Sequence, residues 1–444
     1  MTRRRYGQLG LLRIAAVHGL VLGLLVAALV GCAAPSGPPA DGAGVIASSP
    51  AGPSATPGPR FAAGGHDAEG YGAREGYPVK IISRAPFLVG AFSHYDQFFE
   101  SRVVRRAATP SRLSRAAAEP LVRYRAGVTT HTLDDYIARN PATGLLIARG
   151  DTILVERYQY ARNDRHRFTS FSMAKTVTAM LIGVAIAEGH IRSVDDPAAA
   201  YVPALADTEY GRTSLRHLLQ MSSGVHFSEN YSGADDASRL FIETVFQDGA
   251  GGVEAVKRYN ERDWPSGTLF SYASVETQVL GLVLRSAVRR PVADYLHEKI
   301  WEPMGAEADA TWLIDRTGQE VTFCCLNAVL RDYARLGLLL AHDGSWRGRQ
   351  LIPAAWIGDA TRVRDDQPHL RPGTARRFIG YGYQVWILPG ERRMFALLGV
   401  YGQAIFVDPA SRLVMVHTAA YKQPADSNVE AFALWRGVVA ALGS

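Results

Sequence analysis

The hydrophobic pattern of the chain changes from strand-like to helix-like and then back to strand-like. Residues 144–158 contain two β-rich runs on either side of Gly150 and Asp151, a sequence typical of a β-hairpin. Apolar positions then recur with helical spacing at residues 176–187, 215–221, 240–246, 253–259, 276–288, 295–301 and 329–340. Strand-like runs return at residues 381–388, 394–398, 404–408 and 413–419, before a last predicted helix at 429–442. This order predicts an α+β fold, with an antiparallel sheet closed by both ends of the domain and flanked by helices, and a mostly helical second subdomain.

The N-terminal end has the composition of an export signal. An arginine-rich start is followed by an apolar run over residues 14–30 and by Cys32. The sequence Leu-Val-Gly-Cys at residues 29–32 resembles a bacterial lipobox, in which the cysteine is acylated and becomes the mature N-terminus. An uncleaved membrane anchor is the alternative, but the apolar run is near the lower limit of about 17 residues for a membrane span. We therefore predict a signal peptide at residues 1–31, lipidation of Cys32 and an exported bacterial lipoprotein anchored in a membrane.

Residues 32–120 separate this signal from the main predicted domain. Residues 32–76 are rich in Gly, Pro, Ala and Ser, cannot bury much apolar surface, and are expected to form a flexible tether. Residues 77–120 are an N-terminal extension to which the sequence assigns no role, although the apolar segment at 87–92 is a candidate strand or docking segment. The main folded domain is predicted at residues 121–444.

The overall charge does not indicate a nucleic-acid partner. The 444 residues carry 48 basic and 42 acidic side chains, and much of the excess lies in arginine-rich stretches before residue 126. The sequence contains no nucleic-acid reader motif and no clear basic helix face, so we expect no nucleic-acid binding.

The 12 histidines show no H-E-x-x-H or similar spacing, and no P-loop, dinucleotide fingerprint or G-x-S-x-G elbow is present. We therefore expect neither a metal nor a cofactor.

The two cysteines outside the signal region are adjacent in the sequence. Cys324 and Cys325 could join only through a strained ring, so we do not expect a structural disulfide between them. We predict that both are small buried apolar residues, and a redox-active vicinal pair is the alternative.

Ser172 and Lys175 are the first candidates for a reactive pair. Ser172 lies just ahead of the apolar helical run at 176–187, and Lys175 follows three positions later, so in a helix both side chains lie on one face. The unpaired N–H groups and the positive dipole end at a helix start favour an oxyanion there. This S-x-x-K arrangement is that of a serine acyl-transfer enzyme with Ser172 as the nucleophile. The alternative is that Ser172 only caps the helix.

An S-x-x-K enzyme also needs a proton acceptor and an oxyanion hole. Tyr272 follows a Pro-Gly turn, and a phenolate held beside the Lys175 ammonium could take the Ser172 proton. Ser274 stands two residues further on, within reach of the same cleft. The second oxyanion donor is expected from residues 399–403, where glycines permit close approach of the substrate. The alternative for Tyr272 is a core tyrosine with a hydrogen-bonded hydroxyl, and the alternative for residues 399–403 is a plain hairpin connection.

The order of these segments resembles the penicillin-recognising serine hydrolases, a group that holds class C β-lactamases, D-amino-acid peptidases and related esterases. The matching stretches are residues 172–175, 272–274 and 399–403, with supporting stretches at 217–224 and 330–337. The resemblance covers about residues 125–440 and implies a β-lactamase-like fold. The site residues that it implies are catalytic Ser172, Lys175 and Tyr272, the oxyanion-hole residues Ser172 and Val400, and the substrate-binding residues Ser274, Gly399 and Tyr401.

Within this group the chain looks most like the 6-aminohexanoate-dimer hydrolases, which are amidases with esterase activity. Residues 227–231 resemble a mobile loop whose tyrosine contacts the substrate amide, which makes Tyr231 a substrate-binding candidate; a surface tyrosine is the alternative. Two departures disfavour β-lactams: Ser274 replaces the usual asparagine, and residues 399–401 lack the cationic group that binds the lactam carboxylate. We therefore expect a small neutral amide or ester substrate, cleaved through an acyl-enzyme on Ser172. The alternatives are a β-lactamase or D-amino-acid peptidase, and a non-catalytic surface lipoprotein that binds ligands.

Overall fold

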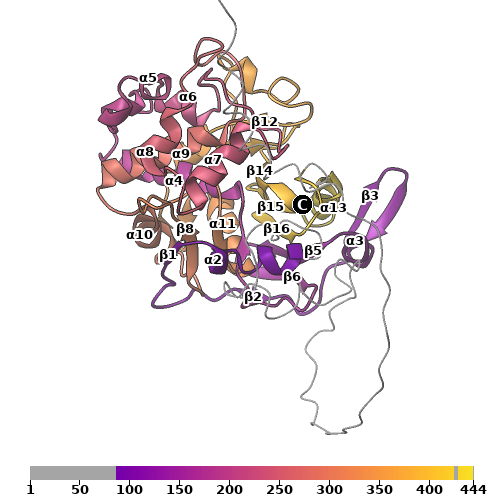
Figure 1. The fold of residues 1–444 in the computed structure, drawn as a ribbon. Coiled ribbons are helices and arrows are strands. Elements are labelled where there is room, and N and C mark those ends of the chain that lie inside the picture. Colours follow the sequence, from indigo (N-terminus) through magenta and orange to yellow (C-terminus); the bar gives the residue numbers. More distant parts are fainter. Residues whose placement is uncertain (1–86, 425–428, 444) are drawn as a thin grey trace, which may run out of the picture.

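An eight-stranded sheet brings the N-terminal hairpin of the domain beside its C-terminal strands (Figure 1). The structure, a computed structural model, describes residues 87–424 and 429–443; the predicted signal peptide, the tether and Cys32 lie outside these residues. The hairpin of β5 (Ala142–Arg149) and β6 (Thr152–Tyr158) pairs with β16 (Leu413–Ala419), which is followed in the sheet by β15 (Gln403–Asp408) and β14 (Phe395–Gly399). These neighbours are antiparallel, as predicted, whereas the short edge strand β2 (Ser114–Arg115) is parallel to β6.

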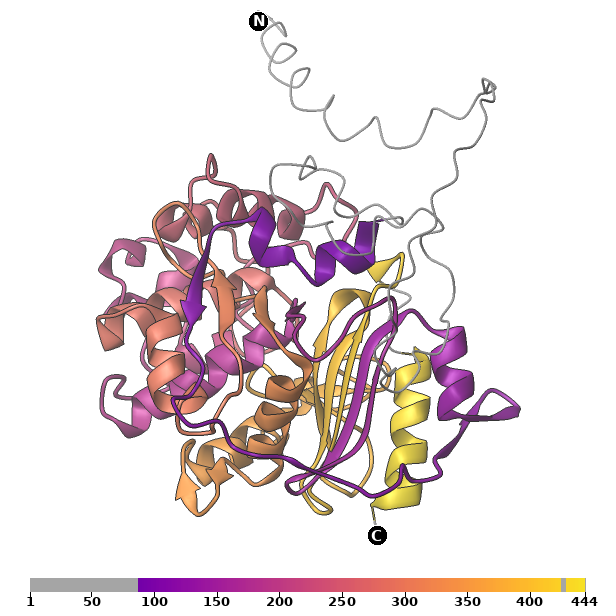
Figure 2. The ribbon, with the colours of Figure 1, turned by 90° about the horizontal axis from the view of Figure 1, so that it is seen from below.

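Both faces of this sheet are covered by helices, because successive residues of its central strands are apolar and point to opposite faces. Leu145 and Ile147 pack on one face with Trp435 of α13 (Val429–Leu442), and α3 (Leu133–Arg139) covers the same face. Leu146 and Ala148 pack on the other face, which α11 (Leu330–Ala341) covers. Figure 2 shows α13 on one side of the sheet and the helical part of the molecule on the other.

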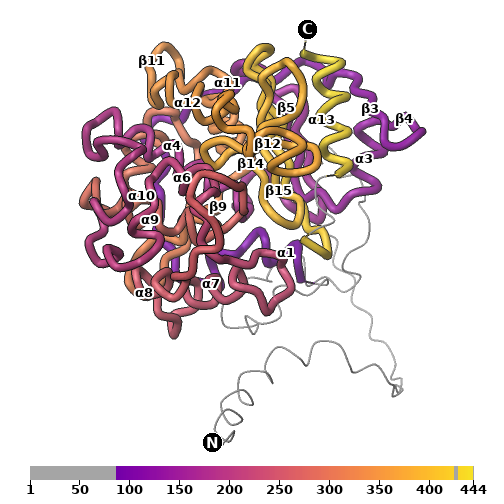
Figure 3. Tube along the Cα trace, turned by 90° about the horizontal axis from the view of Figure 1, so that it is seen from above, coloured from indigo at the N-terminus to yellow at the C-terminus, as the bar shows by residue number. Residues whose placement is uncertain are grey.

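The helical part is built around α4 (Met173–Ala187) and α9 (Ser274–Val288), which pack against each other. Shorter helices surround this pair and lie to one side of the sheet in Figure 1 and Figure 3. They are α5 (Glu209–Arg212), α6 (Leu215–Leu219), α7 (Asp236–Val245), α8 (Gly252–Lys257) and α10 (Val292–Leu296), which a π-helical turn (His297–Trp301) continues. The predicted helical segments are therefore helical in the structure, with ends displaced by a few residues.

A second, four-stranded sheet joins the helical part to the N-terminal extension. Its order is β1 (Ser101–Val104), β8 (Ala310–Leu313), β9 (Leu326–Ala328) and β7 (Phe168–Thr169). The helices α1 (Leu88–Phe92) and α2 (Tyr95–Phe98) precede β1 and are buried in the main core. The folded unit therefore begins before the predicted boundary at residue 121, and the segment at 87–92 is a docked helix rather than a strand.

Two local predictions are wrong. Residues 381–388 form two short paired strands, β12 (Gly380–Tyr381) and β13 (Trp386–Ile387), because the backbone reverses at Gln384 with a φ of 56°. Cys324 and Cys325 are buried, as predicted, but they form a disulfide with their Cα atoms 3.7 Å apart. Cys325 adopts a left-handed backbone with a φ of 69°, a local conformation that the sequence did not indicate.

Two two-stranded sheets and one more α-helix complete the strands and α-helices of the described residues. They are β3 (Arg123–Ala126), β4 (Thr129–Thr132), β10 (Ser345–Trp346), β11 (Arg349–Gln350) and α12 (Ala354–Ala360). None of the helices in residues 87–424 and 429–443 combines the length and the hydrophobicity that a membrane span requires. The same residues contain no cluster of three or more side chains suited to metal binding.

Candidate active site

The chain turns sharply just before Ser172 and presents this serine at the start of α4. Phe171 has a φ of 41°, which is rare for a residue with a side chain, and Ser172 is the N-cap residue of the helix. The turn is held from β9, because the Ser170 N–H donates to the Leu326 carbonyl (2.7 Å) and the Leu326 N–H donates to Ser170 Oγ (3.0 Å). The Ser172 hydroxyl makes no capping hydrogen bond to the helix. The hydroxyl is therefore available for chemistry, which disfavours the capping alternative.

Lys175 is buried and contacts the Ser172 hydroxyl directly. Its Nζ lies 2.9 Å from Ser172 Oγ and donates a second hydrogen bond of 2.8 Å to the Phe323 carbonyl oxygen. Burial lowers the pKa of Lys175 to about 8, and the negative charge of Glu229 opposes this shift only in part. A lysine with this pKa is neutral in about one molecule in ten at pH 7 and can accept the serine proton.

The loop that carries Tyr272 is held by residues 217–224, one of the stretches that the sequence analysis singled out. The Ser271 N–H donates a hydrogen bond of 2.8 Å to the Met221 carbonyl oxygen, which fixes the loop immediately before Tyr272. The Lys175 Nζ lies 5.1 Å from the centre of the Tyr272 ring. The fold thus brings Tyr272, which is distant in sequence, to the Ser–Lys pair.

The protonation of Tyr272 differs from the hypothesis based on the sequence. Burial and the negative charge of Glu229 raise the pKa of Tyr272, and its hydrogen bond with Ser172 opposes this rise only in part. Tyr272 is therefore a neutral phenol at physiological pH, and not the phenolate that we expected beside Lys175. The reason is that the same burial disfavours both charged forms, the ammonium and the phenolate. These shifts make Lys175 the candidate base and Tyr272 a candidate proton donor.

The end of β14 approaches the Ser172 turn closely because residue 399 is a glycine. A Cβ atom at Gly399 would lie only 2.4 Å from the Ser170 carbonyl oxygen and 3.2 Å from Phe171 Cβ. The next residue, Val400, lines the same cavity as Ser172. The backbone N–H groups of Ser172 and Val400 therefore remain our candidates for the oxyanion hole.

An apolar pocket of about 350 Å³ lies beside Ser172. Tyr401 belongs to its wall, with a ring centre 5.2 Å from that of Phe92 and 5.4 Å from that of Phe171. The other large apolar side chains of the wall come from α2 and the residue after it, from α7 and the residue after it, and from the loop before β9. They are those of Tyr95, Phe99, Phe241, Ile242, Phe246 and Phe323. The sequence did not predict this pocket, because its walls lie far apart along the chain.

Glu229 is a further site residue that the sequence did not reveal. Its carboxylate accepts hydrogen bonds from the Ser274 N–H (2.7 Å), the Ser274 hydroxyl (2.8 Å) and the Tyr231 hydroxyl (3.0 Å), and Glu229 lines the same pocket. Ser274 therefore orients Glu229, and Tyr231, which is 42% exposed, lies at the pocket with it. The local signal for Glu229 was its place two residues before Tyr231 in the loop-like stretch.

The chemistry of this arrangement is nucleophilic acyl transfer. A serine hydroxyl beside a buried amine of lowered pKa can lose its proton, and the helix start can stabilise the oxyanion that forms when the serine attacks a carbonyl. The fold and the site thus define a serine hydrolase. The chain belongs to the beta-lactamase family: the sequence model of the family, described as Beta-lactamase, matches residues 130–440.

Similar proteins include hydrolases of amides and esters. The chain is 27% identical over 379 residues to a 6-aminohexanoate-dimer hydrolase from Paenarthrobacter ureafaciens, a match that covers 81% of this chain and 93% of the relative. The structure of a proposed 6-aminohexanoate-dimer hydrolase from Bacillus anthracis matches with a TM-score of 0.72 at 24% identity, over 81% of this chain and 94% of the other. A family VIII carboxylesterase matches with a TM-score of 0.52 at 19% identity, over 68% of this chain and 93% of the other. These structures confirm the β-lactamase-like fold that the resemblance implied.

Proposed function

We propose that the protein hydrolyses an uncharged amide or ester that carries a bulky apolar group. The observation that supports this proposal is the aromatic pocket beside Ser172, which no lysine or arginine of the described residues lines. An apolar group on the substrate gains free energy by leaving water for this pocket. A substrate carboxylate in this pocket would meet the carboxylate of Glu229, which lines it, and this disfavours β-lactams. The similarity to a 6-aminohexanoate-dimer hydrolase supports a hydrolytic reaction of this kind.

The proposed mechanism uses Lys175 as the base and Tyr272 as the acid. Neutral Lys175 takes the proton of the Ser172 hydroxyl, and the serine oxygen attacks the substrate carbonyl. The N–H groups of Ser172 and Val400 stabilise the oxyanion. Tyr272 donates its proton to the leaving amine or alcohol and regains one from Lys175, and water then hydrolyses the acyl-enzyme with the same groups.

Labelling with a serine-reactive fluorophosphonate tests the acyl-enzyme. We expect labelling of the wild type and its loss in Ser172→Ala. Ser214→Ala is the matched control, because Ser214 is an N-cap serine whose side chain does accept a hydrogen bond from its helix, from the His217 N–H. Folded wild-type protein that resists labelling would refute the proposal and favour the non-catalytic lipoprotein.

A series of nitrophenyl esters with acyl groups of increasing size tests the apolar pocket. Phe241→Ala removes part of its wall and should lower kcat/KM about tenfold for an ester that fills the pocket, with little effect on the acetyl ester. Phe378→Ala is the control, because this phenylalanine is 67% exposed and does not line the pocket. Equal losses for small and bulky esters, or faster turnover of a chromogenic cephalosporin, would overturn the proposed substrate class.

We also propose that the enzyme is exported and anchored in a membrane through a lipid on Cys32. The arginine-rich start, the apolar run and the lipobox-like motif support this. Metabolic labelling with a palmitate analogue should mark the wild type but not Cys32→Ser, and the variant should leave the membrane fraction. Membrane retention of an unlabelled variant would favour the uncleaved anchor instead.

A further inference from the structure

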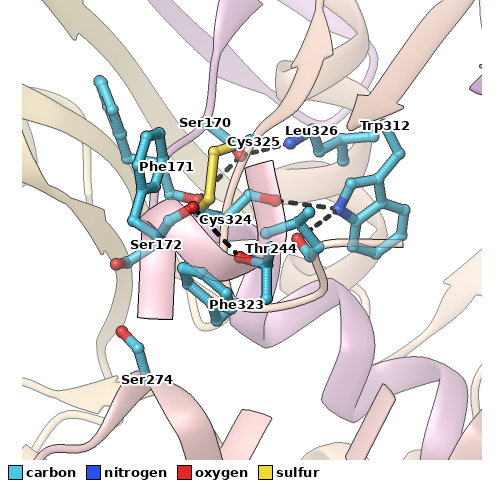
Figure 4. Close-up of a disulfide and its surroundings, with 12 residues drawn as sticks. Ser170, Phe171, Ser172, Thr244, Ser274, Trp312, Phe323, Cys324, Cys325 and Leu326 are labelled. Carbon is cyan, nitrogen blue, oxygen red and sulfur yellow. Dashed lines mark hydrogen bonds between the residues drawn. A yellow bond between two sulfur atoms is a disulfide. The ribbon is translucent and has the colours of Figure 1, made fainter. Parts of the chain in front are cut away.

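The Cys324–Cys325 disulfide lies beside the turn that carries Ser172 (Figure 4). It follows directly on Phe323, whose carbonyl oxygen accepts the hydrogen bond from Lys175 Nζ at 2.8 Å. Cys324 lines the pocket beside Ser172 and is 5% exposed, whereas Cys325 is fully buried. The proposed mechanism makes no use of this disulfide, although it is adjacent to the only backbone carbonyl that binds the base within the described residues.

The segment that contains the disulfide is held through its carbonyl groups. The Thr178 hydroxyl donates to the Thr322 carbonyl oxygen (3.1 Å), and the Trp312 indole N–H donates to the Cys324 carbonyl oxygen (2.9 Å). Between them, the Phe323 carbonyl is paired with the catalytic lysine. Since Lys175 Nζ has only Phe323 and Ser172 as hydrogen-bond partners among the described residues, a displacement of this carbonyl changes the position of the base.

We propose that the Cys324–Cys325 bond positions Lys175 by holding the Phe323 carbonyl against it, so that reduction of the bond by a small dithiol slows the reaction. This inference rests on the proposed acyl-enzyme function. Cys325 has a φ of 69°, which residues with a side chain rarely adopt. The disulfide keeps this conformation, because rotation about the N–Cα bond of Cys325 would pull the two sulfur atoms apart. After reduction Cys325 relaxes toward an ordinary φ, and the preceding peptides turn with it.

Reduction proceeds by thiol–disulfide exchange with the dithiol as electron donor. One reagent thiolate attacks Cys324 Sγ, because Cys324 is the cysteine that lines the pocket, and Cys325 Sγ leaves with the electron pair and takes up a proton. The second reagent thiolate attacks the mixed disulfide, which releases Cys324 as a thiol and closes the reagent into a cyclic disulfide. The protein has then gained two electrons and two protons, and the dithiol has lost them.

The experiment compares oxidised and dithiothreitol-treated full-length protein, with the double variant Cys324→Ser/Cys325→Ser as the control. Rates are measured with a nitrophenyl ester over a range of pH, and free thiols are counted in the same samples. We expect reduction to lower kcat about tenfold with little change in KM, and reoxidation to restore it. The acid limb of the profile should move to higher pH, because water that reaches Lys175 weakens the burial that lowers its pKa. The double variant should show the low rate and no response to dithiothreitol.

Four outcomes would overturn the inference. They are an unchanged rate in reduced protein, a lower rate with an unmoved acid limb, unfolding on reduction, and a dithiothreitol effect that persists in the double variant. If the double variant does not fold, the reversible change in the wild type decides, with circular dichroism to show that the reduced protein is folded. Failure of the proposed function is distinguished from all of these, because it is the absence of fluorophosphonate labelling in the oxidised wild type.

Discussion

The pH dependence of acylation distinguishes the two candidate bases, Lys175 and Tyr272. Burial lowers the pKa of Lys175 to about 8, and its reactive form is the neutral amine. The neutral fraction is then about 0.1 at pH 7, about 0.5 at pH 8 and about 0.9 at pH 9, so kcat/KM should rise roughly tenfold from pH 7 to pH 9 and then level off. A tyrosinate base would give a rate that still rises at higher pH, because burial raises the pKa of Tyr272.

The variant Glu229→Gln tests the same assignment by shifting the pKa of Lys175. The negative charge of Glu229 raises the pKa of Lys175, so its removal should move the acid limb of the profile to lower pH, while the amide oxygen can still accept from Ser274. Glu254→Gln is the control, because Glu254 is an exposed carboxylate paired with Lys257 on α8. The assay is the initial rate of hydrolysis of one ester across the pH range. A profile without an inflection near pH 8, or a limb that moves to higher pH in Glu229→Gln, would refute Lys175 as the base.

Three further changes probe the acid, the oxyanion hole and the stability of the fold. Tyr272→Phe should slow an amide substrate about 10²-fold but a nitrophenyl ester much less, because nitrophenolate leaves without a proton; equal losses would contradict the acid role. Gly399→Ala should lower kcat about 10²-fold, because its Cβ would lie 2.4 Å from a backbone carbonyl oxygen, whereas Gly358→Ala meets only the end of an arginine side chain and should be neutral. Burial lowers the pKa of His417 from 6.5 to about 4, so its contribution to stability is complete above about pH 6.5 and falls by ~3 kcal/mol toward pH 4, where the unfolded chain binds the proton and the folded one does not. Urea unfolding of His417→Gln should show a flatter pH dependence, and a dependence as steep as that of the wild type would argue against this assignment.

The parts of the site that were predictable from the sequence are local or lie in regular elements. Ser172 and Lys175 are three residues apart, and helix geometry alone brings them together. The hairpin at 144–158 and the C-terminal strands were predictable because each is a continuous apolar run bounded by turn residues. The strand at 381–388 was mispredicted because its reversal depends on a left-handed residue, Gln384, whose conformation is set by its surroundings.

The sequence by itself determined the class of reaction, because the Ser172–Lys175 pair, residues 272–274 and residues 399–403 occur in the order of a known group of serine hydrolases. The close approach of Ser172 and Lys175 follows from their helical spacing alone. Only the tertiary structure decided which group holds the proton, because the pKa values of Lys175 and Tyr272 depend on burial in a shared cleft. The tertiary structure also decided which groups surround Ser172. The aromatic pocket, Glu229 and the Cys324–Cys325 disulfide come from segments that are distant along the chain from Ser172. Contacts of this kind have no signature in local spacing, so they emerge only when the chain is folded.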